Sequence, residues 1–127
     1  MPARSPEKLD GLFSEALNAG DLEALVALYE PEATLTPQPG QVVTGTKAIR
    51  EALSAFVATK PRLRLDVKTL AQTSDIALTS AQWELAGTGP DGNPVKMAGH
   101  RVEVSRRQRD GTWLFVIDTP WGLEWGE

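Results

Sequence analysis

The sequence predicts a single α+β domain, because the spacing of its apolar residues changes from a helical period to a strand period. Apolar residues recur every three or four positions up to about residue 58, and every second position between about 62 and 120. Turn sequences join the later segments directly, as in an antiparallel meander. Helices that come first and a sheet that follows are typical of the α+β class, and 127 residues suffice for one such domain.

Three amphipathic segments predict helices over residues 6–19, 21–30 and 46–58. Ser5 is a suitable N-cap for the first helix, and Gly20 suits the left-handed residue that ends it. Asp21 follows at once as the cap of the second helix, so these two helices meet at a sharp corner. Pro31 stops the second helix, because the residue before a proline avoids the α conformation, and Tyr29 closes its apolar stripe.

Segments with strand character occupy residues 33–36, 41–44, 62–69, 76–86, 95–108 and 112–119. The first two flank a proline-rich turn, after which Thr46 is the expected cap of the third helix. Asp110 and Gly111 form the sequence of a two-residue type I′ hairpin. This turn fixes the register of the last two strands and predicts Val104 opposite Ile117.

The same register assigns the side chains of the last two strands to two faces. One face carries His100, Val102, Val104, Trp113, Phe115 and Ile117. The other face carries Arg101, Glu103, Ser105, Leu114, Val116 and Asp118. We expect the first, apolar face to lie under the helices with its histidine at the margin, and the mixed face to be solvated or to form a dimer interface. A single β-bulge would exchange these assignments.

Composition argues against several classes of function. The chain has no cysteine, which excludes disulfides, thiolate metal sites and a cysteine nucleophile. Its net charge of -4 argues against nucleic-acid binding. A single histidine and the lack of a metal-binding motif lead us to expect no metal and no cofactor. We also expect a cytoplasmic protein without membrane contact, because the N-terminus is not a signal peptide and no run is long enough for a membrane span.

Three stretches together resemble the SnoaL-like branch of the nuclear transport factor 2-like superfamily. They are residues 16–33 with the sequence ALNAGDLEALVALYEPEA, the return into a helix at 45–49, and residues 107–122 with their DG turn. The resemblance implies a cone-shaped fold in which three helices wrap a curved antiparallel sheet and a pocket lies between them. It also implies a homodimer paired through the sheets, with residues 1–127 as one SnoaL-like domain.

The superfamily includes ketosteroid isomerases, scytalone dehydratase, epoxide hydrolases and polyketide cyclases, so the fold alone assigns no reaction. Where ketosteroid isomerase has its Asp base, this sequence has Pro37, and its oxyanion tyrosine falls on Phe13. A proline cannot abstract a proton and a phenyl ring cannot donate a hydrogen bond. The second acid of that enzyme falls near Glu103, which alone cannot restore the mechanism. The resemblance therefore predicts no steroid isomerisation by that route.

His100 and Asp118 are the candidate acid–base residues. Histidine is the residue type whose charge changes near neutral pH, and a cavity would make His100 a general base. The alternative is a histidine at a strand start that bonds to a neighbour and has no chemical role. Asp118 either contributes a polar group to the pocket or ends the last strand by accepting backbone hydrogen bonds. The two residues form an orienting pair only if a bulge brings both to one face.

Tyr29, Trp83 and Trp121 are the candidate ligand-binding residues, because aromatic side chains with a polar tip suit the lining of an apolar pocket. Core packing or dimer contacts are the alternatives for each of them. Three functions stay open: an isomerase, cyclase or hydratase acting on a small apolar molecule; a non-catalytic domain that binds or senses such a molecule; and a dimeric protein-interaction module.

Overall fold

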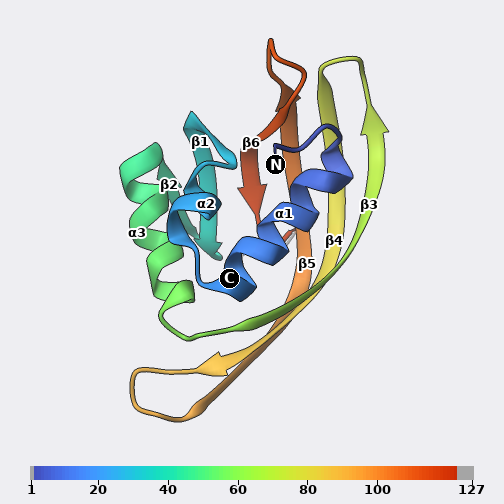
Figure 1. Cartoon of the computed structure of the whole chain (residues 1–127). Coiled ribbons are helices and arrows are strands. Elements are labelled where there is room, and N and C mark those ends of the chain that lie inside the picture. The colour runs from blue at the N-terminus through green and yellow to red at the C-terminus, as the bar shows by residue number, and fades with distance from the viewer. Residues whose placement is uncertain (1, 123–127) are drawn as a thin grey trace.

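The computed structural model describes residues 2–122, which form a six-stranded sheet with three helices against one face (Figure 1). The strands are β1 (Tyr29–Gln38), β2 (Gln41–Thr44), β3 (Arg62–Gln72), β4 (Ile76–Thr88), β5 (Pro94–Arg107) and β6 (Trp113–Thr119). Across the sheet they follow the order β2-β1-β6-β5-β4-β3. Figure 1 shows that β3, β4 and β5 are long and strongly curved, with the helices on their concave side. The class is α+β.

The helices are α1 (Pro6–Ala19), α2 (Leu22–Val26) and α3 (Thr46–Val57). At the start of α1 the Ser5 hydroxyl accepts a hydrogen bond from the Lys8 amide at 3.2 Å. Gly20 ends this helix with a left-handed φ of 72°. Asp21 then caps α2 by accepting a hydrogen bond from the Ala24 amide at 3.1 Å. This sharp corner lets α2 pack on both α1 and α3.

The second helix is shorter than the sequence predicts, because it ends at Val26 instead of about residue 30. Tyr29 is the first residue of β1, where it pairs with Phe115 of β6. The Phe115 amide also donates a 2.8 Å hydrogen bond to the Leu28 carbonyl. Pairing with a distant strand therefore outweighs the helical pattern of the local sequence.

The start of α3 also differs in detail from the prediction. Thr46 is its first residue, and the cap is Gly45, whose φ of 94° suits glycine. The Thr46 hydroxyl donates instead to the Pro31 carbonyl at 3.5 Å. This contact ties the return into α3 to the beginning of β1.

The prediction of a wholly antiparallel sheet is wrong at one pair of strands. β1 and β6 run parallel, with Tyr29 opposite Phe115 and Leu35 opposite Asp118. The other neighbours are antiparallel. Short turns fix the direction of successive strands, whereas β1 and β6 are separated along the chain by α3 and most of the sheet. No local sequence signal determines the direction of such a pair.

The turn between β5 and β6 is longer than the predicted two-residue hairpin. Arg107 pairs with Trp113, so residues 108–112 form the loop. The Asp110 carboxylate accepts hydrogen bonds from the Thr112 amide at 3.0 Å and from its hydroxyl at 2.6 Å. These local bonds hold the wider loop closed.

A β-bulge in β6 compensates for the wider loop. Ser105 pairs with Phe115 and Val104 pairs with Ile117, so Val116 is an extra residue on β6. The predicted pair of Val104 and Ile117 is confirmed, although the turn that predicted it is different.

The wider loop sets Ser105 opposite Phe115 and so turns the odd-numbered residues of β5 inward, and the bulge then turns Asp118 inward. The predicted faces are therefore wrong for most of β5 and the end of β6. Four side chains that were predicted on the mixed face are buried instead: Arg101, Glu103, Ser105 and Asp118. Ile117 was expected in the core and is 43% exposed. Trp113 and Phe115 precede the bulge and are buried as predicted.

The core lies between the helices and the inner face of the sheet. Its most deeply buried apolar side chains are Leu9, Leu25, Leu35, Ile49 and Phe115. Burial of a side chain of this size stabilises a fold by roughly 1.5–3 kcal/mol. No helix within residues 2–122 has the length and hydropathy needed to cross a membrane.

Candidate active site

Asp118 lies at the centre of a buried polar cluster on the inner face of the sheet. Its side chain is 0% exposed. Its Oδ2 atom accepts hydrogen bonds from the Tyr29 hydroxyl at 2.5 Å and from Arg101 Nη2 at 2.9 Å. Its Oδ1 atom has no hydrogen-bond partner among residues 2–122. One carboxylate oxygen is therefore held in place and the other is available for a further partner.

Tyr29 acts as a permanent donor to this carboxylate. Burial and the charge of Asp118 raise the pKa of Tyr29 well above its ordinary value. The phenol therefore keeps its proton across the physiological pH range. Its ring also packs against Phe115, with the two centroids 5.2 Å apart.

Arg101 supplies the positive charge of the cluster and is 3% exposed. Its Cζ atom lies 4.1 Å from the ring centroid of Phe13, a distance at which a guanidinium and an aromatic ring attract each other. Burial works to lower the pKa of Arg101, but the charges of Asp118 and Glu103 outweigh that effect and raise the pKa above its ordinary value. The guanidinium therefore stays charged. Phe13 is the residue on which the resemblance places the oxyanion tyrosine of ketosteroid isomerase, and its ring lies against this cation.

Glu103 and Asp10 complete the cluster. Thr79 Oγ1 donates a 3.0 Å hydrogen bond to Glu103 Oε1. Burial raises the pKa of Glu103 to about 9; Arg101 opposes the shift, and Asp10 adds to it. Burial also raises the pKa of Asp10, which projects from α1. Glu103 is therefore protonated at neutral pH. Asp118, in contrast, forms an ion pair with Arg101.

A cavity of about 50 Å³ adjoins the cluster. Arg101 and Asp118 are the two charged residues among those that line it. The other lining residues are apolar or aromatic: Phe13, Leu17, Leu35, Leu53, Phe56, Leu63, Trp83, Leu85, Pro120 and Trp121. Small-molecule sites in proteins usually measure roughly 300–1,000 Å³. A ligand of more than a few atoms therefore requires some of these side chains to move.

Trp83 and Trp121 line one side of the cavity and meet edge to face, with ring centroids 5.3 Å apart. The Trp121 indole nitrogen donates to the Pro37 carbonyl at 2.8 Å, and that of Trp83 donates to the Pro120 carbonyl at 2.7 Å. The Trp83 ring covers Gly99 of the adjacent strand, where any Cβ atom would lie only 3.2 Å from the ring. The glycine therefore makes room for the indole beside the cavity.

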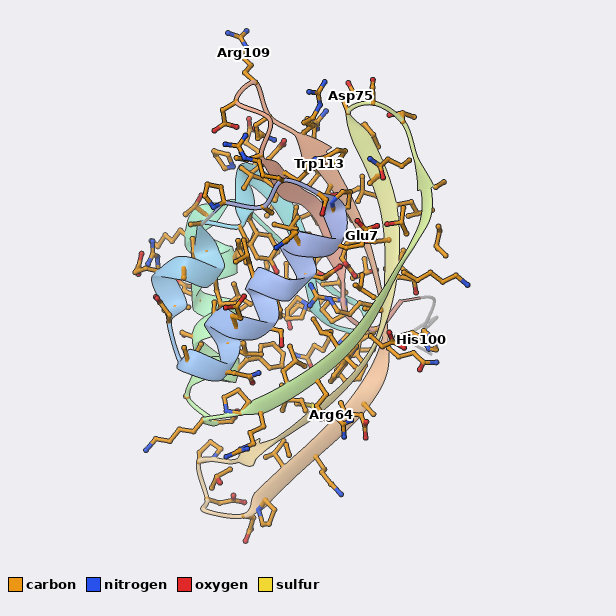
Figure 2. The ribbon with its side chains drawn as sticks, turned by 45° about the vertical axis from the view of Figure 1, so that its right-hand side comes forward. Glu7, Arg64, Asp75, His100, Arg109 and Trp113 are labelled. Atoms are coloured by element: carbon orange, nitrogen blue, oxygen red, sulfur yellow. The ribbon has the colours of Figure 1, made fainter. Side chains whose placement is uncertain are left out.

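His100 lies on the other face of the sheet. Figure 2 shows it at the edge of the molecule, away from the helices, and its side chain is exposed. It borders a hollow on the outer side of β3, β4 and β5, together with Arg64 and Asp66. His100 and Asp118 do not form the orienting pair considered from the sequence, because the bulge turns Asp118 inward whereas the register set by the wider loop leaves His100 outside. Tyr29, in contrast, bonds directly to Asp118.

Sequence reasoning missed Asp10 and Arg101, and it noted Glu103 only as the position near which the second acid of ketosteroid isomerase falls. Two signals point to them in hindsight. Asp10 lies three positions before Phe13 and therefore shares the buried stripe of the first helix. Arg101 and Glu103 alternate with valines on a strand, so one of the two sets must face the core.

A larger surface groove lies elsewhere and measures about 970 Å³. It runs past the ends of α1 and α3 and carries Lys60, Arg62, Arg64 and Lys96. No member of the buried cluster lines it. The combination of an acid, a cation and an enclosed apolar surface occurs at the small cavity.

A curved sheet with helices on its concave side and a polar cluster under them defines an α+β protein of the NTF2-like class. Three solved structures share this fold. They are a proposed dehydratase of the NTF2-like family from Streptomyces avermitilis, a proposed scytalone dehydratase from Novosphingobium aromaticivorans, and a ketosteroid isomerase-like protein from Erwinia carotovora atroseptica. A family model described as a SnoaL-like domain matches residues 11–116, and the chain belongs to this family.

The Streptomyces protein is 22% identical with a TM-score of 0.75, over 89% of this chain and 90% of that one. The Novosphingobium protein is 16% identical with a TM-score of 0.80, over 91% and 80% of the two chains. The Erwinia protein is 19% identical with a TM-score of 0.77, over 89% of each chain. No protein with a curated description matches this sequence. Identities this low establish a shared fold and leave the reaction to the site itself.

Proposed function

We propose that this SnoaL-like domain is an enzyme that moves a proton on a small, mostly apolar molecule, in a dehydration or isomerisation, with Asp118 as the general base. The observation that carries the proposal is that Asp118, whose Oδ1 atom has no hydrogen-bond partner among residues 2–122, is one of the residues that line an apolar cavity. Two of the neighbours with the same fold are named as dehydratases, which supports this class of reaction.

The two oxygens of Asp118 suit this role because only one is engaged. Oδ2 is bound by Arg101 and Tyr29, which fix the orientation of the carboxylate. Oδ1 is the atom that accepts a proton from a C–H group of the substrate. Arg101 lines the same cavity, and its positive charge stabilises the negative charge that develops on a substrate oxygen. The proton then returns to another carbon in an isomerisation, or to a departing hydroxyl that leaves as water in a dehydration.

The walls of the cavity favour a hydrocarbon skeleton with one carbonyl or hydroxyl group. Apart from Arg101 and Asp118, every lining side chain is apolar or aromatic. Entry of a molecule larger than the cavity displaces Trp121, whose indole is held by one hydrogen bond to the Pro37 carbonyl. The intermediate burial of Trp121 makes it the easier of the two tryptophans to move.

The test measures proton abstraction directly and requires no knowledge of the product. Small cyclic ketones and β-hydroxy ketones are incubated with the protein in deuterated water, and exchange at the carbon next to the carbonyl is followed by proton NMR. We expect the wild-type protein to accelerate exchange for at least one of them. Asp118→Asn is expected to lower that rate by about 10²–10⁴-fold, the usual contribution of general acid–base catalysis.

Asp66→Asn is the matched control, because Asp66 is an exposed carboxylate on the outer face of β3. It should leave the exchange rate unchanged. Equal exchange by the wild type and the Asp118 variant would contradict the catalytic role. If a ketone binds without any exchange, the alternative function of a non-catalytic binding domain is supported instead.

We propose further that the outer face of the sheet binds a second copy of this chain. Leu78, Val104 and Ile117 pair across β4, β5 and β6 in one continuous row. Leu78 and Ile117 are 36% and 43% exposed. The row carries no charged residue, whereas the outer face of β3 carries Arg64 and Asp66. This difference favours the row as a contact surface, because the centres of protein–protein interfaces are depleted of charged residues. A face of the same composition on a second copy would cover this row.

Val104→Asp should convert the protein from dimer to monomer, because it places a charge in the middle of the row. Sedimentation velocity measures the change. Val42→Asp is the control, since Val42 is 62% exposed on β2 and lies outside the row. A wild-type monomer, or a Val104 variant that remains dimeric, would contradict the proposed interface.

A further inference from the structure

Two buried carboxyl groups next to the proposed base have oxygen atoms that lack a hydrogen-bond donor. Both oxygens of Asp10 and the Oε2 atom of Glu103 have no hydrogen-bond partner within residues 2–122. Asp10 is 1% exposed and Glu103 is 0% exposed. An ionised carboxylate can only accept hydrogen bonds, and two that face each other in a buried site repel. One proton between them supplies the missing donor and removes one of the charges.

We propose that Asp10 and Glu103 share one proton in a carboxyl–carboxylate hydrogen bond, and that Asp10 is thereby a positioning residue that reserves the Arg101 guanidinium for Asp118. The second half of this statement rests on the proposed role of Asp118 as the base. The first half concerns the two carboxyl groups alone.

The contacts of Arg101 agree with a proton on this pair. Its Nη2 atom lies 2.9 Å from Asp118 Oδ2 and forms a hydrogen bond with it. Its Nε atom lies 3.4 Å from Glu103 Oε2, and the two atoms form no hydrogen bond. A fully ionised Glu103 at the same depth would compete with Asp118 for this cation, because charge-assisted bonds are shorter and stronger than neutral ones.

The charges around the pair explain why it retains a proton. Among residues 2–122, Arg101 is the one cation that faces the cluster, whereas the acids are Asp10 from α1, Glu103 from β5 and Asp118 from β6. Glu7 at the start of α1 and the phenol of Tyr29 add no positive charge. Burial raises the pKa of both carboxyl groups, and the charge of Asp10 adds to the rise for Glu103. One cation therefore balances Asp118, and the pair holds a proton of its own.

Titration of side-chain carboxyl groups by ¹³C NMR on the ligand-free full chain tests the proposal. In the wild type we expect one carboxyl of the pair to keep its proton above neutral pH. In Asp10→Asn the titration of Glu103 should move down by at least about one pH unit, because the negative charge that favours its protonated form is gone and the new amide can donate a hydrogen bond to its ionised form. Glu15→Gln, an exposed change on the same helix, should leave this titration in place.

The Arg101 guanidinium gives a second readout that a merely structural role would not move. In Asp10→Asn its Nε resonance should shift at neutral pH as ionised Glu103 becomes a partner. An unchanged Glu103 titration in this variant, or a wild-type pair that is fully ionised at neutral pH, overturns the proposal.

Glu103→Gln keeps the test decisive if the Asp10 variant does not fold. The amide can still donate a hydrogen bond to Asp10 but cannot ionise. The titration step above neutral pH should therefore disappear, and its persistence would overturn the shared proton. None of these measurements uses a ligand. They can succeed when the ketone exchange test fails, so failure of this inference and failure of the proposed function are seen separately.

Discussion

Replacing Arg101 with methionine is expected to destabilise the protein by about 3–5 kcal/mol at neutral pH, because it leaves buried acids without a counter-charge. Arg101 is 3% exposed and lies within ion-pair distance of Asp118 and Glu103. Domains of this size are stable by only about 5–15 kcal/mol, so the loss is a large part of the total. Urea denaturation followed by circular dichroism measures it.

The destabilisation should shrink at acidic pH. Burial favours the protonated form of carboxyl groups that have lost their cation, and protonation removes the unbalanced charge. Arg64→Met is the control, because Arg64 is exposed on the outer side of β3, and it should change stability by less than about 0.5 kcal/mol. A variant of Arg101 that is as stable as the control at neutral pH would show that the buried charge network is not as described.

The stability of the wild type is expected to fall as pH rises from about 4.5 towards about 9, because of Glu103. The folded protein keeps the Glu103 proton up to about pH 9, whereas the unfolded chain loses it near 4.5. Between these values the folded state binds more protons, so stability is fully present below the lower value and is lost as pH rises through the upper one. The slope for one proton is roughly 1 kcal/mol per pH unit.

Glu103→Gln isolates this contribution from all other titrating groups. The difference in unfolding free energy between the variant and the wild type should grow with pH in favour of glutamine. Urea denaturation in a series of buffers across this range measures the difference. Glu84→Gln, an exposed change on the neighbouring strand β4, should show no such trend. A pH-independent difference for the Glu103 variant would mean that this carboxyl is already ionised in the folded protein at neutral pH.

Much of the fold could be predicted from local signals. The first helix runs from Pro6 to Ala19, as the caps at Ser5 and Gly20 indicate. The strands from Arg62 onward follow the alternating pattern to within a few residues. The end of the second helix could not be predicted, because Tyr29 pairs with a strand nearly ninety positions later in the chain. Local propensity contains no information about that partner.

The candidate site was predictable only in part, for two reasons that lie in the β5–β6 hairpin. Val116 forms a bulge that has no distinctive sequence signal, and it reverses the face of Asp118 relative to a plain hairpin. The longer loop sets Ser105 instead of Arg106 opposite Phe115, which turns the polar residues of β5 inward and leaves His100 outside, whereas the strict register placed them the other way. Trp83 and Trp121 were expected to line a cavity on grounds of residue type, and they do lie beside one.

The sequence by itself determined the α+β class, the first helix, the strand order of the final meander and the SnoaL-like family, because these depend on periodicity, caps and turns that lie close together in the chain. The tertiary structure decided the mixed sheet, the inward turn of Asp118 and the meeting of Asp10, Arg101 and Glu103. Those features depend on contacts between distant segments and on a single extra residue in a strand. A shift of one residue reverses every side chain that follows, so the chemistry of the site depends on packing that no local pattern specifies.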